Sequence, residues 1–136
     1  MSEPFRNLTP KRRLLLILVP MLATFACQRS YLHIVGVRHV HAFGYLVHHL
    51  FFGVLIQVPA AFILAFGARS RWVGSAALVA LGIGTGMILD EVTYLVATRA
   101  TDADYISSLS LGGAIAFISL AVILLLTLYG LHREEK

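Results

Sequence analysis

Four long apolar segments, joined by short polar connections, constrain the fold of this chain more than any other feature. We expect helices over residues 14–35, 40–67, 72–98 and 105–128. A helix needs about 20 mostly apolar residues to cross a bilayer, and a soluble domain with 58% hydrophobic and 13% charged residues would lack polar surface. The sequence therefore predicts an all-α integral membrane protein, a four-helix up-down bundle forming a single membrane domain over residues 1–136.

The positive charges are divided unevenly between the two ends of this predicted bundle. Eight of the eleven Lys and Arg residues lie in the N-terminal segment, the connection between the second and third helices, and the C-terminal segment. Arg29, Arg38 and Arg99 lie at the other end. Because cytoplasmic loops are enriched in Lys and Arg, we expect a multi-pass protein of the plasma (inner) membrane with both termini in the cytoplasm. The charges form no single patch, so lipid is the expected partner rather than nucleic acid.

A histidine-rich stretch, residues 38–53, carries four of the six histidines into the second apolar segment. Ionisable side chains inside a bilayer are costly and usually functional. If the stretch is helical, His41, Tyr45 and His48 share one face, and His49 lies about 100° round the helix. Both members of the His48–His49 pair could then border a cavity.

Buried polar groups of all four predicted helices are expected at one depth. Counting inward at about 1.5 Å per residue places His48 and His49 roughly 12 Å below the outer surface, level with Asp90 and Glu91 of the third helix. The other members of this layer are Arg29, Tyr45, Tyr94 and Ser110. The polar site is therefore expected near the outer face of the membrane.

Small residues lie along the predicted third and fourth helices and would let neighbouring backbones approach closely in lipid. On the third helix they are Gly82 and Gly86, in line with Asp90. On the fourth helix the expected stripe is Ser108, Gly112, Ala116 and Ser119. Tyr105, at the start of that helix, is interpreted as an interfacial anchor.

Two motifs on successive helices resemble those of a group of small prokaryotic membrane proteins. The first is HHLFFG over residues 48–53, similar to HHxxxG, and the second is GIGTGMILDE over residues 82–91, similar to GxGxGLxxDE with Met in place of Leu. The likeness covers about residues 38–96. The resemblance implies four helices and points to the same His and carboxylate pairs, and it implies no particular activity.

Two imidazoles facing two carboxylates are typical ligands for Zn or Fe. The leading hypothesis is a metal-dependent enzyme that acts on a lipidic or apolar substrate near the outer leaflet. The expected metal ligands are His48, His49, Asp90 and Glu91, with His41 as a further candidate. Asp90 or Glu91, if not a ligand, could act as general base, and Arg29 or Arg38 could hold an anionic headgroup.

Three other functions remain open from the sequence. The first is a metal or proton transporter or sensor, which would need a homo-oligomer because one polar layer offers no internal repeat for alternating access. The second is haem binding, which would need His33 or a second chain as the other axial ligand. The third is a structural or assembly subunit in which Arg29 pairs with Asp90 or Glu91.

Overall fold

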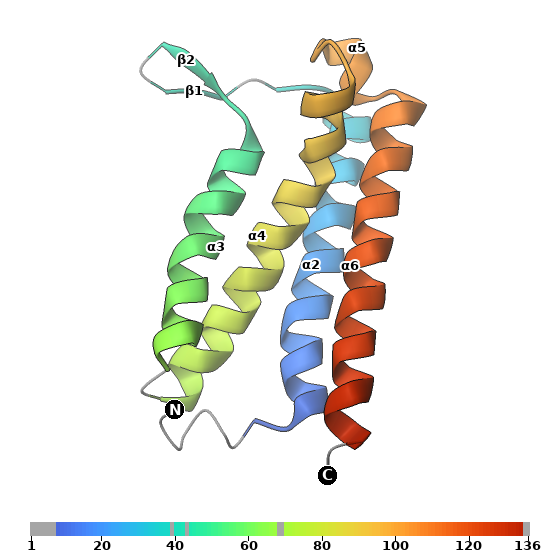
Figure 1. Ribbon diagram of the computed structural model, residues 1–136. Helices are drawn as coiled ribbons and strands as arrows, with labels where there is room; N and C mark the ends of the chain where they lie inside the picture. Colours follow the sequence, from blue (N-terminus) through green and yellow to red (C-terminus); the bar gives the residue numbers. More distant parts are fainter. Residues whose placement is uncertain (1–7, 39, 43, 68–69, 135–136) are drawn as a thin grey trace.

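A computed structural model describes residues 8–38, 40–42, 44–67 and 70–134 of the 136-residue chain. Four long helices dominate it: α2 (Pro10–Val35), α3 (His49–Phe66), α4 (Arg71–Ala97) and α6 (Ser108–Glu134). Each is long and apolar enough to cross a membrane. Successive long helices run in opposite directions, so the connectivity is up and down, as the sequence predicts (Figure 1).

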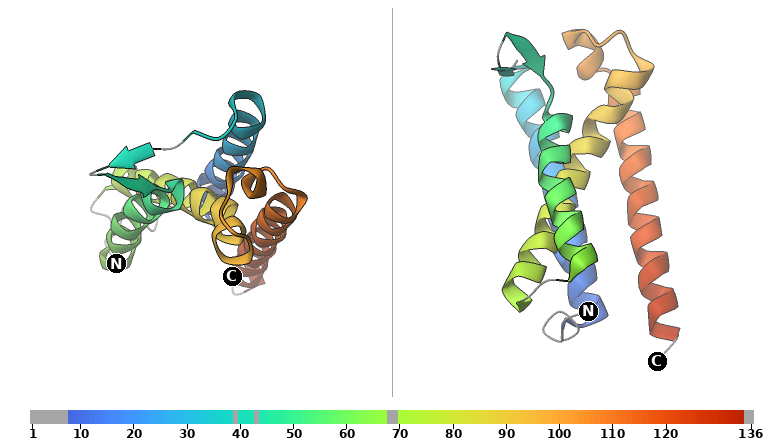
Figure 2. Two further views of the ribbon diagram at one scale, coloured as in Figure 1. Left: turned by 90° about the horizontal axis from the view of Figure 1, so that it is seen from above. Right: turned by 60° about the vertical axis from the view of Figure 1, so that its left-hand side comes forward.

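α4 is the central helix of the arrangement. It packs against α3, α2 and α6, and α2 also packs against α6. Viewed from above, α3 lies on one side of α4, with α2 and α6 on the other (Figure 2). Polar side chains of α4 can therefore contact all three neighbouring helices.

Glycines set the close approach of α4 to its neighbours. A Cβ atom on Gly84 would lie 2.7 Å from the carbonyl oxygen of Gly53 in α3, and one on Gly82 would lie 2.3 Å from that of Ile17 in α2. A Cβ on Gly86 would likewise meet the Met21 carbonyl oxygen at 2.6 Å. The glycine-rich stretch of α4 thus lets its backbone touch α2 and α3, as expected for helices packed in lipid.

The helix expected over residues 40–67 begins at His49, so that prediction was wrong for its first turns. Residues before it form an antiparallel hairpin of β1 (Val40–Ala42) and β2 (Tyr45–Val47), in which Val40 pairs with Val47. Gly44 has a φ of +83°, which favours glycine and suits a tight turn. β-Branched residues at the paired ends also favour strands over a helix.

The other helix ends differ less from expectation. α2 begins at Pro10, four residues before the expected start, and α4 is displaced by one residue. The last helix starts at Ser108 because residues before it form a separate short helix, α5 (Asp102–Tyr105). Thr101 and Asp104 make a reciprocal capping box at the start of α5, which fixes this turn.

The face of α6 that packs on the bundle also differs from the expected small-residue stripe. Ser110, Ala114 and Ile118 are buried, whereas the four residues of the expected stripe are exposed. Gly113 provides the close contact, because a Cβ there would lie 2.2 Å from Thr93. The sequence placed small residues on α6 correctly and assigned them the wrong rotation about the helix axis.

Large apolar side chains cover much of the outer surface. Phe66, Trp72 and Val96 are among many that are mostly exposed. A water-soluble protein rarely exposes so extensive an apolar surface, whereas lipid chains cover it without cost. The outward-facing residues agree with a multi-pass membrane protein.

Candidate functional site

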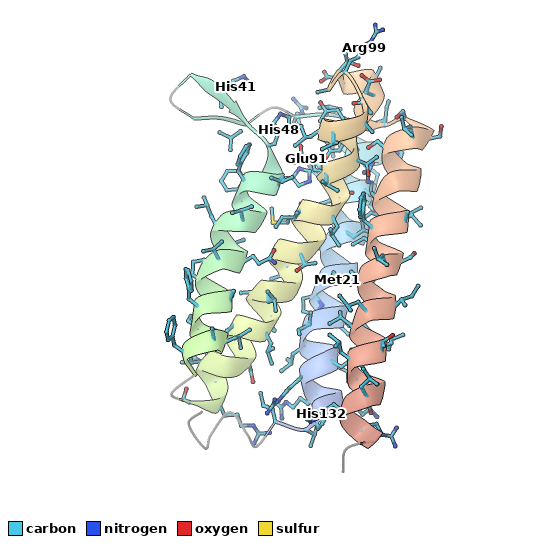
Figure 3. The ribbon with its side chains drawn as sticks, in the orientation of Figure 1. Met21, His41, His48, Glu91, Arg99 and His132 are labelled. Carbon is cyan, nitrogen blue, oxygen red and sulfur yellow. The ribbon has the colours of Figure 1, made fainter. Side chains whose placement is uncertain are left out.

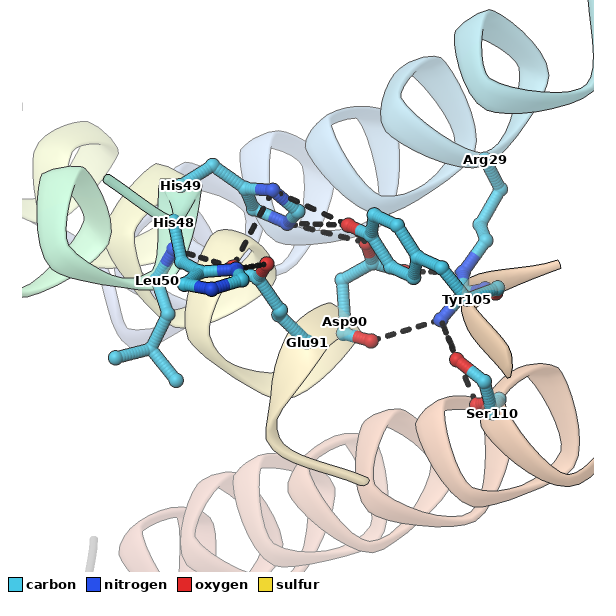
Figure 4. Close-up of polar contacts among 8 residues, drawn as sticks. All are labelled: Arg29, His48, His49, Leu50, Asp90, Glu91, Tyr105 and Ser110. Atoms are coloured by element: carbon cyan, nitrogen blue, oxygen red, sulfur yellow. Dashed lines mark hydrogen bonds and ion pairs between the residues drawn. The ribbon is translucent and has the colours of Figure 1, made fainter. Parts of the chain in front are cut away.

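Arg29 of α2 forms the centre of a buried polar network that joins α2 to α4, α5 and α6. Its Nε donates to Oδ1 of Asp90, and its Nη2 donates to the Asp90 carbonyl at 2.8 Å. Nη1 donates to the Tyr105 carbonyl at 3.2 Å, and Nη2 also reaches Oγ of Ser110 at 3.3 Å. Both charged groups are almost fully buried. A buried ion pair is tolerated only with such additional hydrogen bonds (Figure 4). We call the Arg29–Asp90 ion pair the clasp, because its hydrogen bonds hold α2 against the neighbouring helices.

Glu91 lies beside Asp90 on α4 and interacts with the start of α3. One carboxylate oxygen accepts a hydrogen bond from the backbone N–H of Leu50 at 2.8 Å, and the other lies 2.7 Å from Nδ1 of His48. His48 is the N-cap residue of α3, and its own side chain makes no capping hydrogen bond. Glu91 therefore caps α3 from the neighbouring helix, where the positive end of the helix dipole favours a carboxylate.

His49 lies between the two carboxylates. Its Nε2 is 3.2 Å from Oδ2 of Asp90, and its Nδ1 is 3.3 Å from Oε2 of Glu91. The Tyr105 hydroxyl lies 3.1 Å from each ring nitrogen. Figure 4 shows the imidazole between these groups, with Arg29 on the far side of Asp90. Asp90 thus connects the Arg29 clasp to an imidazole.

Tyr105 is a member of the site that the sequence interpretation missed. Its hydroxyl donates to Oδ2 of Asp90 at 3.3 Å, and its ring stacks on Tyr94 with centroids 4.4 Å apart. Burial, together with the charges of Asp90 and Glu91, raises the pKa of the Tyr105 phenol well above its ordinary value. The phenol therefore stays protonated and acts as a hydrogen-bond donor. The Thr101 capping box just before it was the sequence signal for a turn that returns this side chain to the bundle.

The fixed charges of the cluster do not balance. Two buried carboxylates, Asp90 and Glu91, face one permanent cation, Arg29. A proton on His48 or His49, or a bound cation, would supply the missing positive charge. Further positive charge beside the two carboxylates would be favourable, because uncompensated charge is costly in a dry interior.

A cavity of about 450 Å³ borders this cluster. His49 and Tyr105 line it on the side of the polar network, and Gln28, Tyr31 and Leu32 of α2 form part of its wall. Arg38, which is exposed, also contributes to the lining. Its volume lies within the range of small-molecule sites. His49 therefore contacts both carboxylates and also lines a space that could hold a ligand.

The donor types of the cluster suit a metal, but its side chains are bonded to one another. The imidazole nitrogens of His48 and His49 lie 2.7–3.3 Å from carboxylate oxygens. Within the described part of the chain, no group of three or more His, Cys, Asp or Glu side chains is arranged to hold a metal ion. A metal would have to replace these contacts with its own.

The remaining predicted site residues lie in different places. His41 lies on β1 with its side chain exposed, so it does not share a helical face with His48 (Figure 3). Tyr45 lies on β2, and its side chain is outside the described part of the structure. Tyr94 and Ser110 join the buried network through Tyr105 and Arg29 respectively. The candidate site is therefore His48, His49, Asp90, Glu91, Arg29 and Tyr105.

Comparisons with known proteins found no matching family model, no matching curated protein and no matching solved structure.

Proposed function

We propose that this protein is a membrane-embedded enzyme that uses acid–base chemistry on a lipidic substrate bound beside His49. One observation carries the proposal: the same imidazole contacts Asp90, lies against the Tyr105 hydroxyl and lines the cavity. An imidazole oriented by a buried carboxylate is the commonest proton donor or acceptor in enzymes. A substrate group in the cavity would lie between His49 and the wall formed by α2 and Tyr105.

Each group has a distinct role in this proposal. In this proposal the substrate replaces Glu91 at Nδ1 of His49, while Nε2 keeps its contact with Asp90. Nδ1 then accepts a proton from one substrate atom and returns it to another, so the proton is conserved over the cycle. Asp90, itself fixed by Arg29, orients the ring and offsets the charge of the imidazolium. Tyr105 stays neutral and donates its single O–H to Asp90, so it helps to hold the carboxylate that orients the ring. Exclusion of water from the bundle would strengthen these interactions.

The test is a search for a converted compound. Purified protein in liposomes is incubated with a lipid extract of its host membrane, and the extract is compared by mass spectrometry before and after incubation. The proposal predicts a compound consumed by the wild type and left intact by His49→Gln. His132→Gln, altered at the opposite end of the bundle (Figure 3), should behave as the wild type. Equal conversion by His49→Gln would contradict the proposal.

A metal site is the second candidate, and the charge imbalance of the cluster is the observation that favours it. A divalent cation among His48, His49 and Glu91 would supply positive charge next to two carboxylates and could activate a water molecule. Elemental analysis of protein purified without chelator decides this point. Stoichiometric Zn or Fe, lost in both His48→Ala and Glu91→Gln, would support it, and a metal-free active enzyme would exclude it.

The proposed location is the plasma membrane, with both termini in the cytoplasm and the His49 site towards the outer leaflet. The excess of Lys and Arg at the end that contains the termini supports this orientation. Single-cysteine proteins in a Cys27→Ser background test it. An impermeant maleimide should label Ala103→Cys in intact spheroplasts and label His132→Cys only after permeabilisation. The reverse labelling pattern would show that both termini lie outside the cytoplasm and would contradict this orientation.

A further inference from the structure

Gln28 of α2 is a polar residue that takes no part in the contacts described above for Arg29, Asp90 and His49. It lines the cavity, and its Oε1 is buried with no hydrogen-bond partner in the described part of the chain. A primary amide offers both a donor and an acceptor, and leaving such a group unpaired in a dry interior is costly. A turn of the side chain towards the cavity would give this oxygen a partner if a ligand there carried a hydrogen-bond donor.

Arg38 gives the same cavity a positive charge. Its side chain is exposed and lies in the segment between the end of α2 and the hairpin. Arg29, by contrast, has its donors engaged by Asp90, Tyr105 and Ser110. Of the two arginines that the sequence offers as headgroup ligands, Arg38 is the one that borders the cavity. A phosphate or carboxylate is the group that an arginine at the membrane interface recognises.

Apolar groups make up the rest of the wall. Leu32 is buried and Tyr31 is half exposed, so this part of the cavity suits a hydrocarbon. Both lie on α2, whose outer surface is apolar and faces lipid in the proposed arrangement. A chain bound against these residues could extend from the cavity into the bilayer.

We propose that the cavity binds a single-chain anionic amphiphile. Its phosphate or carboxylate pairs with Arg38, a hydroxyl or amide next to the headgroup bonds to Gln28, and its apolar chain lies against Tyr31 and Leu32. The headgroup end then lies beside His49 and Tyr105. This amphiphile would be the substrate of the proposed enzyme, and in that respect the assignment rests on the proposed function. Binding of the amphiphile can be measured without any turnover.

Cys27 supplies a direct probe of occupancy. It is the only cysteine of the chain, its side chain is exposed, and it lines this cavity. The rate at which N-ethylmaleimide alkylates Cys27 in detergent-solubilised protein should therefore fall when the cavity is filled. The probes are oleoyl lysophosphatidic acid, oleic acid and uncharged monoolein, each titrated to obtain an apparent Kd.

We expect at least one of the two anionic probes to protect Cys27 at concentrations about tenfold lower than monoolein does. Protection by lysophosphatidic acid alone would identify a phosphate ligand, and protection by oleic acid would identify a carboxylate. Arg38→Gln should raise the Kd of the protecting anion about tenfold. Gln28→Leu should raise the Kd of lysophosphatidic acid several-fold, because that probe carries a hydroxyl beside its phosphate, and should leave the Kd of oleic acid unchanged. Arg99→Gln, an exposed arginine in the segment between α4 and α5, is the matched control and should bind as the wild type.

Equal protection by monoolein, or an unchanged Kd in Arg38→Gln, would overturn the assignment. His49→Gln separates the two proposals, because it should keep the Kd within about threefold while it abolishes conversion. Anion binding without any conversion would leave this assignment standing and sink the proposed enzyme. Equal conversion by the wild type and Arg38→Gln would support the proposed enzyme and overturn this assignment of its ligand.

Discussion

The carboxylate of Glu91 in α4 accepts a hydrogen bond from the backbone N–H of Leu50 in α3, over 2.8 Å, so one helix caps another. α3 begins at the point where the hairpin ends, and no side-chain cap comes from its own N-cap residue, His48. Glu91 thereby fixes the direction of the chain as it enters the membrane. It also holds His48, at 2.7 Å, on the same carboxylate.

Replacement of Glu91 tests this capping role. Glu91→Ala leaves the Leu50 N–H and the His48 ring without their partner, and should lower the free energy of unfolding by about 1–3 kcal/mol. Glu91→Gln keeps an acceptor oxygen and should recover part of this loss. Unfolding in mixed detergent and sodium dodecyl sulfate micelles measures both. If the alanine variant is no less stable than the glutamine variant, Glu91 is not a structural cap.

The Arg29–Asp90 clasp predicts strong energetic coupling. Arg29→Met or Asp90→Leu alone leaves one buried charge unpaired and should destabilise the protein by about 3–5 kcal/mol. The double variant removes both charges and should cost markedly less than the sum of the single changes. A double-mutant cycle in the same micelle assay gives the coupling energy. Additive effects would show that the two side chains do not act as a pair.

The close approach of α3 and α4 can be tested by adding a single methyl group. In Gly84→Ala the new Cβ would lie 2.7 Å from the Gly53 carbonyl oxygen, so the helices must separate, at a cost of about 1–3 kcal/mol. In Gly112→Ala the new Cβ would have no atom of the described residues within 4 Å, and alanine favours a helix by up to about 1 kcal/mol. We expect thermal stability to fall in the first variant and to hold or rise in the second. Equal effects would contradict the packing.

The raised pKa of Tyr105 predicts how stability depends on pH. Since the folded pKa lies above the ordinary value of 10.0, the neutral phenol stabilises the folded state below that pH. The contribution is lost as the pH rises from 10.0 towards the folded pKa. Stability should therefore fall above about pH 10, and fall less in Tyr105→Phe. The difference in phenolate absorbance between the two proteins measures the pKa directly, and titration at the ordinary value would show that Tyr105 is not buried.

The sequence predicts the helices and the polar groups that meet, because both depend on local patterns. Apolar length gives the spans. The count of about 1.5 Å per residue that placed His49 level with Asp90 assumed a helix from residue 40, where the structure has the hairpin, so that step was wrong. His49 meets Asp90 because it lies at the start of α3, beside α4. The hairpin was missed because an apolar run of this length in a membrane chain is normally helical, and its strand signal is only three residues on each side of a turn. The position of Tyr105 depends on how α5 returns to the bundle, which periodicity within one helix does not encode.

The rotation of α6 was equally beyond the sequence. Lipid and protein interior are both apolar, so the outward and inward faces of a membrane helix have similar compositions. Gly112 and Gly113 are adjacent, yet only Gly113 contacts α4 through Thr93. Contacts with neighbouring helices decide the facing residue, and these are known only from the folded chain.

Turnover by His49→Gln, measured beside its affinity for the same amphiphile, tests the central claim most directly. If His49 transfers the proton, kcat should fall by about 10²–10⁴-fold. The Kd should stay within about threefold of the wild type, because Arg38 and Gln28 are intact. A variant that binds the amphiphile normally and converts it at the wild-type rate would contradict the account.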